Sequence, residues 1–311
     1  MSTSTLSPTK PEALNSLFSL GDQLQFESGP GGFTIARLSS PWGEATVSVY
    51  GGHVLSYTPT GQEPVLWVSE EAQYEAGKAI RGGIPVIWPW FGPNKQDPDK
   101  PSHGFARNQT WEVFASRLID NEKPQLRLIL QDNAMSYSAW PHSFRIELIV
   151  TLDKSLHVDL QIINTGNSPF DFTGALHTYL NVSQIENASI AGLEGCLYID
   201  QLENMAIKSQ HKDITFEAET DNIYFNTKSS CHLLDAGYNR KVVVEKRGSG
   251  STVVWNPWIA KAKRMSDFGN EEYKTMLCIE TANAGPDSIT LNPGGEHVLG
   301  TSIHAFALEN L

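Results

Sequence analysis

Cysteines and long apolar segments are scarce in this sequence. Its 311 residues include three cysteines, and Cys196, Cys231 and Cys278 show no Cys-x-x-Cys spacing. Neither a zinc site nor a disulfide framework is therefore indicated. No window of about 18 apolar residues could span a membrane, and the N-terminal region lacks the basic and then apolar stretches of a secretory signal. We expect a soluble, cytoplasmic protein with no membrane partner.

An excess of positive charge is also lacking. The formal net charge is -12 at pH 7, whereas nucleic acids and anionic membranes attract surfaces rich in lysine and arginine. The sequence has no Gly-x-x-x-x-Gly-Lys-Ser/Thr or Gly-x-Gly-x-x-Gly motif for phosphates of nucleotides, and no Gly-x-Ser-x-Gly nucleophile elbow. We therefore expect no nucleic-acid partner, and nucleotides are not the favoured ligand.

The pattern that is present is an alternation of apolar and polar residues with a period of two. It is clearest in residues 145–164, where two alternating runs flank a turn at Asp153, Lys154 and Ser155 and predict a β-hairpin. Similar runs cover residues 45–50, 53–58, 125–131, 189–193, 241–246, 252–255, 276–281, 288–291 and 297–307. Many short strands at close spacing predict an all-β fold, a large antiparallel β-sandwich with a few short helices.

Only two stretches favour a helix, residues 12–20 and residues 70–79. Rossmann and TIM-barrel folds need repeated helices of about 10 to 15 residues between strands, and these are missing. No linker rich in proline or serine divides the chain. We expect a single domain over residues 20–311, preceded by a loosely held N-terminal segment, residues 1–19.

The most informative segment covers residues 79–111, where Arg81, His103 and Arg107 surround an aromatic, proline-rich run. A guanidinium beside an apolar wall needs an anionic or carbonyl partner. Because arginine can bind two oxygens at once, the segment predicts a pocket for a small anion such as a phosphate or carboxylate. The alternative is that both arginines pair with acidic residues of the same protein.

Two titratable residues interrupt apolar runs elsewhere in the chain. Glu280 lies in an apolar strand, where an unpaired carboxylate has a shifted pKa, so it is a candidate base. His177 also lies in an apolar run. The structural alternative for His177 is a core histidine bonded to backbone carbonyls. The structural alternative for Glu280 is one member of a buried ion pair. Asp221 is more weakly marked and could be an acidic residue of a turn.

A metal site is a further alternative. His103, His177 and Glu280 match the residue count of an iron site with two histidines and one carboxylate. Their wide separation, and the lack of a His-Glu-x-x-His motif, give that interpretation no sequence specificity. We expect no catalytic metal and no other cofactor.

Read in order, four motifs resemble those of the glucose-6-phosphate 1-epimerase family, the hexose-6-phosphate mutarotases. They are Arg81-Gly82-Gly83-Ile84-Pro85, His103-Gly104-Phe105-Ala106-Arg107, His177-Thr178-Tyr179 and Cys278-Ile279-Glu280. The resemblance extends over about residues 51–307. It implies a galactose-mutarotase-like β-sandwich that interconverts the α and β anomers of a phosphorylated hexose without a cofactor.

The resemblance also implies roles for the residues of the acid and base chemistry. His177 matches the general acid of the family and Glu280 its general base, while Asp221 matches an acid that holds sugar hydroxyls and the histidine. An ordinary glutamate and histidine have the required protonation states together only below about pH 6.5. We expect Asp221 to raise the pKa of His177 and widen that range, and the pH profile to be bell-shaped with its upper limb set by His177.

The remaining motif residues match the substrate-binding part of the family. Arg81 and Arg107 match the phosphate-binding arginines, and His103 could bind a hydroxyl, contact phosphate or only shape its loop. Ser102 departs from the family, since some relatives have a substrate-binding glutamine there. The serine hydroxyl can still donate one hydrogen bond, with a shorter reach.

Two other functions fit parts of this sequence. A non-catalytic carbohydrate-binding β-sandwich would use the same tryptophans but would need no buried acid and base. A glycosidase could place Asp221 and Glu280 on either side of a glycosidic bond. We expect the partner to be a small phosphorylated hexose and the protein to be a monomer.

Overall fold

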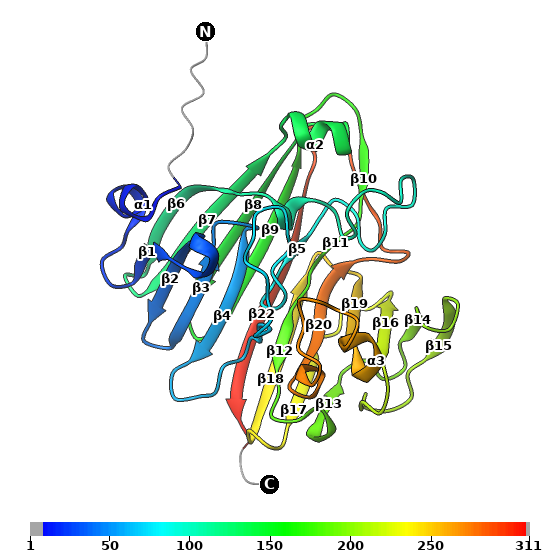
Figure 1. The fold of residues 1–311 in the computed structure, drawn as a ribbon. Helices are drawn as coiled ribbons and strands as arrows, with labels where there is room; N and C mark the ends of the chain where they lie inside the picture. Colours follow the sequence, from blue (N-terminus) through cyan, green and yellow to red (C-terminus); the bar gives the residue numbers. More distant parts are fainter. Residues whose placement is uncertain (1–8, 309–311) are drawn as a thin grey trace.

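The computed structural model describes residues 9–308 of the chain. Antiparallel β-sheets dominate it, and short helices join a few of the strands (Figure 1). Two of the sheets have eight strands, one has four and one has two. The predicted all-β class and antiparallel β-sandwich are confirmed.

One eight-stranded sheet, called here the back sheet, has the order β13-β17-β18-β22-β9-β8-β7-β6. Its strands are β6 (Glu112–Ile119), β7 (Lys123–Gln131), β8 (Phe144–Leu152), β9 (Leu156–Asn164), β13 (Ala188–Ala191), β17 (Cys231–Asp235), β18 (Arg240–Arg247) and β22 (Glu296–Ala307). Burial alternates residue by residue along β9, so one face of the sheet is apolar and packs inward. The hairpin predicted for residues 145–164 is confirmed as β8 and β9.

The other eight-stranded sheet, called the front sheet, has the order β15-β14-β16-β19-β20-β11-β5, with β12 also paired to β20. Its strands are β5 (Val86–Ile87), β11 (Gly174–Leu176), β12 (Tyr179–Asn181), β14 (Leu197–Asp200), β15 (Ala206–Ser209), β16 (Thr220–Phe225), β19 (Ser251–Asn256) and β20 (Met276–Asn283). Every residue of β20 is buried, including the polar residues Glu280, Thr281 and Asn283. The outer face of the front sheet is therefore covered as well as the inner one.

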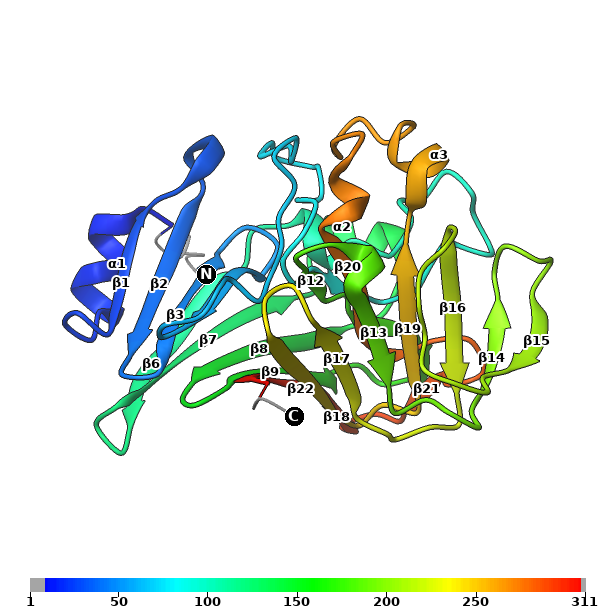
Figure 2. The same cartoon turned by 90° about the horizontal axis from the view of Figure 1, so that it is seen from below.

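Two smaller sheets complete the sandwich. The four-stranded sheet contains β1 (Leu24–Ser28), β2 (Thr34–Ser40), β3 (Gly43–Ser48) and β4 (His53–Pro59), and the two-stranded sheet pairs β10 (Phe170–Phe172) with β21 (Ile289–Leu291). The four-stranded sheet packs on β7 and β8 of the back sheet, whereas β11 and β20 of the front sheet pack on β22 (Figure 2). The back sheet is thus a continuous layer with two sheets covering its two halves.

The described helices are all short. They are α1 (Pro11–Phe18), α2 (Ala134–Ala139) and α3 (Trp258–Ala262), with single 3-10 turns η1 (Pro30–Gly32), η2 (Ala106–Asn108), η3 (Ile185–Asn187) and η4 (Glu272–Lys274). The helix predicted at residues 12–20 is confirmed as α1. It buries Leu14 completely, and the Asn15 side chain bonds the backbone N–H and carbonyl of Phe26 at 2.8 and 2.7 Å. Residues 1–8 of the predicted N-terminal segment lie outside the described residues, and the division of the chain at residue 20 stays a prediction.

The helix predicted at residues 70–79 is wrong, because this segment forms turns. Gly77 has φ +86°, in the left-handed region that a continuing helix excludes. The Ser69 hydroxyl and the Glu70 backbone N–H donate to the carboxylate of Glu272, at 2.6 and 2.8 Å. These long-range contacts outweigh the weak local preference for a helix.

None of the helices formed by residues 9–308 combines the length and the apolar character needed to cross a membrane.

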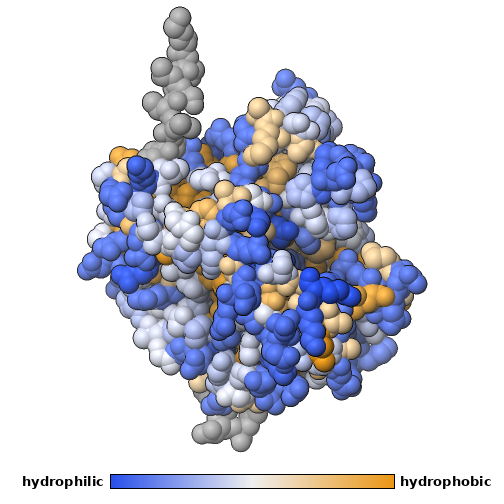
Figure 3. Space-filling view, viewed as in Figure 1, coloured by the Kyte–Doolittle hydropathy of each residue, from blue (hydrophilic) through white to orange (hydrophobic). Residues whose placement is uncertain are grey.

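The edge of the front sheet formed by β14 and β15 has an apolar surface, visible at the right of Figure 3. Its exposed side chains are Leu197, Leu202, Met205 and Ile207.

Candidate active site

A pocket of about 340 Å³ lies on the outer face of the front sheet. Loops from the segment between β4 and η2, together with α3, contribute to its walls. All the site residues predicted from the sequence line it: Arg81, Ser102, His103, Arg107, His177, Asp221 and Glu280. The fold therefore brings together side chains that are separated by up to about two-thirds of the chain.

The alternation of β20 explains why Glu280 points into this pocket. Leu277 and Ile279 face the main core, so Cys278 and Glu280 face the opposite side of the sheet. Asp221 of β16 lies opposite Trp255 of β19, which in turn lies opposite Cys278. Because directly opposed residues of antiparallel strands share a face, Asp221 and Glu280 both project from the outer face.

His177 lies between β11 and β12, which pair in succession with β20. Leu176 is opposite Thr281, and Tyr179 is opposite Cys278. This register places His177 directly opposite Glu280, and their side chains share the outer face. The strand pairing therefore sets the contact between these two groups.

The His177–Glu280 pair is buried and incompletely hydrogen-bonded. Nε2 of His177 is 3.3 Å from Oε1 of Glu280, and the side chains are 9% and 2% exposed. Nδ1 of His177 and Oε2 of Glu280 are both buried without a hydrogen-bond partner among residues 9–308. Buried polar atoms are rarely left unpartnered, so these two atoms are free to bind a ligand.

Burial lowers the pKa of His177 well below its usual value of 6.5, and His103, Arg107 and Arg81 lower it further. The imidazolium is disfavoured because it would be desolvated close to two guanidiniums. The expectation that Asp221 raises the pKa of His177 is therefore wrong. Desolvation and positive neighbours determine this pKa.

Burial has the opposite effect on Glu280 and raises its pKa well above the usual 4.5. The carboxylate of Asp221 raises it further, while Arg107 lowers it. Together with the lowered pKa of His177, this favours a pair that carries one proton and no net charge. The two groups are in contact, so they titrate as a unit.

His103 is a neutral hydrogen-bond donor. Its Nδ1 accepts the Gly92 backbone N–H at 3.2 Å, which leaves the proton on Nε2. Burial, then Arg107, Arg81 and Lys261, lower the pKa of His103 to about 3. His103 also has φ +68°, an uncommon conformation that fixes the ring at the pocket.

The two predicted arginines have different surroundings. Arg81 binds both carboxylate oxygens of Asp267, at 3.0 and 3.2 Å, and donates to the Tyr179 hydroxyl at 3.1 Å. For Arg81, the alternative of a partner within the protein is therefore realised. Arg107 donates to the Ser102 carbonyl at 3.0 Å, and its Nε is buried without a partner among the described residues. Burial lowers the pKa of Arg107 to about 10, so it remains charged at neutral pH.

The sequence analysis missed several residues of the pocket. Gln201 donates to Asp221 at 2.5 Å, and Nζ of Lys261 is 3.6 Å from Asp221 and 3.3 Å from Glu219. Lys261 also lies over the Trp255 ring, 5.6 Å from its centroid. Gln201 follows β14 and Lys261 lies on the five-residue α3, so no sequence spacing connects them with Asp221.

The residues considered for a metal site do not form one in this geometry. His177 Nε2 faces Glu280, and His103 Nδ1 accepts from the backbone. Across residues 9–308, no three His, Cys, Asp or Glu side chains lie close enough together to hold a metal ion. The arrangement instead resembles a proton-transfer pair beside an anion-binding group.

The sequence matches a known family over most of its length. The model of the family described as Aldose 1-epimerase matches residues 35–304. A Cenchrus ciliaris protein named "Putative glucose-6-phosphate 1-epimerase" is 40% identical over 267 residues, which cover 81% of this chain and 78% of that protein. A protein of the same name from Escherichia coli strain K12 is 36% identical over 245 residues, 78% of this chain and 81% of that protein.

Solved structures show the same fold. The crystal structure of a "putative mutarotase (YeaD)" from Salmonella typhimurium has a TM-score of 0.86 and 29% identity, covering 97% of both chains. A galactose mutarotase-like protein from Clostridium acetobutylicum has a TM-score of 0.72 and 18% identity, covering 93% of this chain and 98% of that chain. The galactose-mutarotase-like β-sandwich implied by the sequence motifs is confirmed.

Proposed function

This chain belongs to the aldose 1-epimerase family and interconverts sugar anomers, and we propose that its substrate is a hexose 6-phosphate, namely glucose 6-phosphate. The relatives that carry the name glucose-6-phosphate 1-epimerase support this choice of substrate. The pocket on the outer face of the front sheet is the proposed active site. A non-catalytic sugar-binding role is not favoured.

The observation that carries the proposal is the His177–Glu280 pair. A histidine and a glutamate 3.3 Å apart, both buried and each with an unpartnered atom, can exchange protons with a ligand. A protein that only bound sugar would gain nothing from burying two such groups, because their desolvation is unfavourable. An acid and a base in contact are what the opening of a hemiacetal requires.

Ring opening needs two proton transfers. The Glu280 carboxylate takes the proton of the C1 hydroxyl, the bond from C1 to the ring oxygen breaks, and the protonated His177 gives its proton to that oxygen. The product is an open-chain aldehyde, which rotates about the C1–C2 bond. Reclosure then uses the same groups in reversed roles and gives the other anomer, so no net proton is consumed.

The pair needs one shared proton for this cycle. After ring opening, Glu280 is protonated and His177 is neutral, which is the state that burial favours in the free protein. Before ring opening, the shared proton must lie on His177. A bound phosphate would assist that transfer, because its negative charge would offset Arg107 and Arg81, which lower the pKa of His177.

Phosphate recognition is assigned mainly to Arg107. Its guanidinium has a buried donor with no partner within residues 9–308, whereas the charge of Arg81 is balanced by Asp267. Ser102 and His103 can add one hydrogen-bond donor each. Hydrogen bonds to charged groups contribute about 1.5 to 3 kcal/mol, so free glucose is expected to be a poor substrate.

The test is magnetisation-exchange NMR between the anomers of glucose 6-phosphate, mannose 6-phosphate and galactose 6-phosphate. Wild type should accelerate anomer exchange of glucose 6-phosphate well above that of free glucose, and His177→Ala should abolish most of the acceleration. Equal acceleration for glucose and glucose 6-phosphate would remove the phosphate from the proposal. Sugar binding without any acceleration would instead support the non-catalytic alternative.

We also propose that the protein is a cytoplasmic monomer. The pocket residues named here all belong to one chain, so a single copy supplies the acid, the base and the phosphate-binding arginine. Light scattering of the purified protein should give the mass of one chain. A larger mass would correct this part of the proposal and leave the chemistry unchanged.

A further inference from the structure

A second and larger cavity, of about 480 Å³, lies outside the proposed active site. Its walls come from the loop after α2, from β10 and β21, and from the loop of residues 94–100. It shares no residue with the active-site pocket. A smaller cavity between them shares Phe91 and Pro93 with the first and Trp140 and Asp171 with the second.

The indole of Trp140 gives the second cavity a rigid aromatic wall. Its centroid is 5.0 Å from that of Trp88 and 4.7 Å from that of Phe170, both in edge-on contact, and 4.4 Å from that of His142. Trp140 is half-buried, so part of the ring remains available to a ligand. Apolar residues are also visible in Figure 3 at the top of the molecule, over α2. An aromatic wall of this kind packs well against the C–H face of a sugar ring.

Polar groups with fixed orientations line the same cavity. Oδ1 of Asn94 accepts the backbone N–H groups of Gln96 and Asp97, both at 2.9 Å, which leaves the amide NH₂ group as a donor. Oδ1 of Asp171 accepts the Thr290 hydroxyl at 2.5 Å, which leaves Oδ2 as an acceptor. A sugar hydroxyl both donates and accepts, so a donor and an acceptor beside an aromatic ring match its chemistry.

The charges of this cavity favour a neutral ligand. It contains no arginine, and Nζ of Lys100 is 3.9 Å from the carboxylate of Asp97. Burial lowers the pKa of His142, so that ring is neutral at pH 7. The carboxylate of Asp171 would repel a phosphate. We propose that this cavity is a second sugar-binding site, which takes the ring of an unphosphorylated hexose between Trp140, Asn94 and Asp171.

Saturation-transfer NMR with methyl β-D-glucopyranoside tests the proposal. This glycoside has no phosphate and cannot open its ring, so it is not a substrate. The active site is saturated with 1,5-anhydroglucitol 6-phosphate, which lacks the C1 hydroxyl and cannot react. Saturable binding should persist under these conditions. Asp171→Ala should weaken it by at least about 10-fold, as expected for the loss of a hydrogen bond to a charged group.

Asp120→Ala is the matched control, because Asp120 is an exposed aspartate bonded to Lys123 and lies outside the cavity. It should leave binding of the glycoside unchanged. Trp140→Phe, which keeps an aromatic ring in the same packing, provides a second variant and should weaken binding without unfolding the protein. No saturable binding, displacement by the 6-phosphate, or equal binding by wild type and Asp171→Ala would each overturn the proposal. None of these outcomes bears on anomer exchange.

Discussion

Among residues 9–308, two histidine–glutamate pairs of nearly equal length occur, and only one of them lies in the pocket. Nε2 of His177 is 3.3 Å from Oε1 of Glu280, and Nε2 of His304 is 3.2 Å from Oε2 of Glu245. The first pair is on the front sheet and the second on the back sheet. Their chemical groups are the same, so their surroundings must account for any difference in reactivity.

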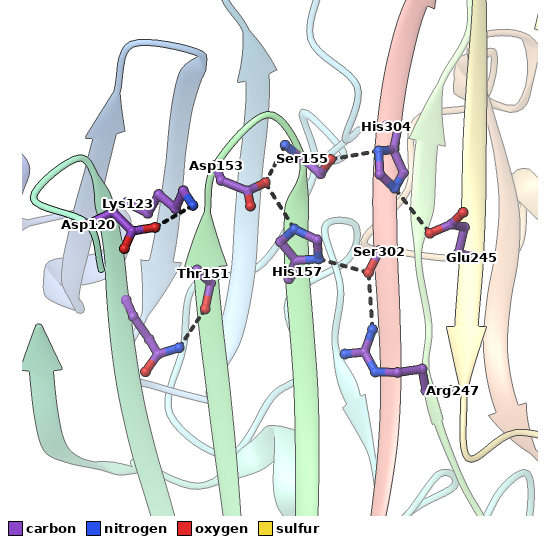
Figure 4. A network of polar contacts seen from close by, with 11 residues as sticks. Asp120, Lys123, Thr151, Asp153, Ser155, His157, Glu245, Arg247, Ser302 and His304 are labelled. Atoms are coloured by element: carbon purple, nitrogen blue, oxygen red, sulfur yellow. Dashed lines mark hydrogen bonds and ion pairs between the residues drawn. The ribbon is translucent and has the colours of Figure 1, made fainter. Parts of the chain in front are cut away.

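The second pair belongs to what we call the back-sheet network, which spans β9, β22 and β18 (Figure 4). Its residues are Asp153, Ser155, His157, Glu245, Arg247, Ser302 and His304. All four imidazole nitrogens in the network have a partner: His304 bonds Ser155 at 2.6 Å as well as Glu245, and His157 bonds Ser302 at 2.8 Å and Asp153 at 2.9 Å.

Solvent and hydrogen bonding separate the two pairs. The side chains of His304 and Glu245 are 26% and 54% exposed, against 9% and 2% for His177 and Glu280. Neighbouring side chains and exposure to solvent satisfy the His304–Glu245 pair, whereas among residues 9–308 the His177–Glu280 pair retains two buried unpartnered atoms. Burial and unused hydrogen-bonding capacity, rather than the contact itself, therefore distinguish a reactive pair from a structural one.

The largest expected effect comes from removing the base of each pair. Glu280→Gln should lower the rate of glucose 6-phosphate anomer exchange by about 10² to 10⁴, because the amide cannot accept the C1 proton. Glu245→Gln, the matched change on the back sheet, should leave the rate unchanged. Exchange NMR measures both, with circular dichroism to establish folding. Similar losses in the two variants would break the comparison.

The next effect concerns one arginine from each region. Arg107→Ala should lower kcat/KM for glucose 6-phosphate by roughly 10 to 100 fold, because it removes a hydrogen bond to the phosphate, and should not lower kcat/KM for free glucose. Arg247 already bonds Ser302 at 3.2 Å and pairs with Asp159. Arg247→Ala should therefore leave both sugars unaffected. If Arg107→Ala slowed both sugars equally, Arg107 would not be the phosphate-binding group.

A third effect is the width of the pH range in which the enzyme is active. In the proposed mechanism only the singly protonated His177–Glu280 pair is active, and burial opposes both its gain and its loss of a proton. Activity should therefore extend over a wider range than the interval between the ordinary values of 4.5 and 6.5. Rate measurements from pH 4 to 9 check this expectation. A decline that began at pH 6.5 would show an isolated histidine instead of a coupled pair.

Arg107 should determine where the limbs of that profile lie. It lowers the pKa of both His177 and Glu280, so Arg107→Ala should move both limbs to higher pH. The alkaline limb follows the raised pKa of Glu280, so the expectation that His177 sets it is wrong. Asp221→Asn should move this limb to lower pH, because Asp221 raises the pKa of Glu280. Arg247→Ala is the control and should leave the profile in place. Opposite displacements would contradict the assigned electrostatics.

Whether an element depends on nearby or on distant residues explains which parts of the fold could be predicted. The β8–β9 hairpin follows from alternation and a turn within 20 residues, and all nine other predicted runs overlap observed strands. The helix expected at residues 70–79 is absent because Glu272, far away in sequence, binds the start of that segment. The short strands β11 and β12 have too few residues to show a pattern.

The candidate site shows this limit more sharply. The motif residues stand out by their apolar surroundings, the resemblance to a known family implies that they form one site, and the structure places them in one pocket. The strand register that places His177 opposite Glu280 could not be predicted from the sequence, because it depends on pairing between distant strands. Asp267, which binds Arg81, lies in an irregular segment, and Lys261, which lies near Asp221, belongs to a very short helix. Because neither segment has a sequence pattern that places it at the pocket, these two contacts could not be predicted.

The smallest expected effect is on stability, and it has the opposite sign in the two regions. A glutamate with a raised pKa stabilises the fold fully below its unfolded value, and this contribution is lost as pH rises through the folded value. Glu280→Gln, which removes this loss, should match wild type near pH 4, below the unfolded pKa, and exceed it by about 0.5 to 2 kcal/mol at pH 8. Glu245→Gln should cost no more than about 1 kcal/mol, since it breaks an exposed pair. Urea unfolding at both pH values measures the two differences. A destabilised Glu280→Gln variant at pH 8 would mean that the buried carboxylate supports the fold, and the contrast between a reactive and a structural pair would then fail.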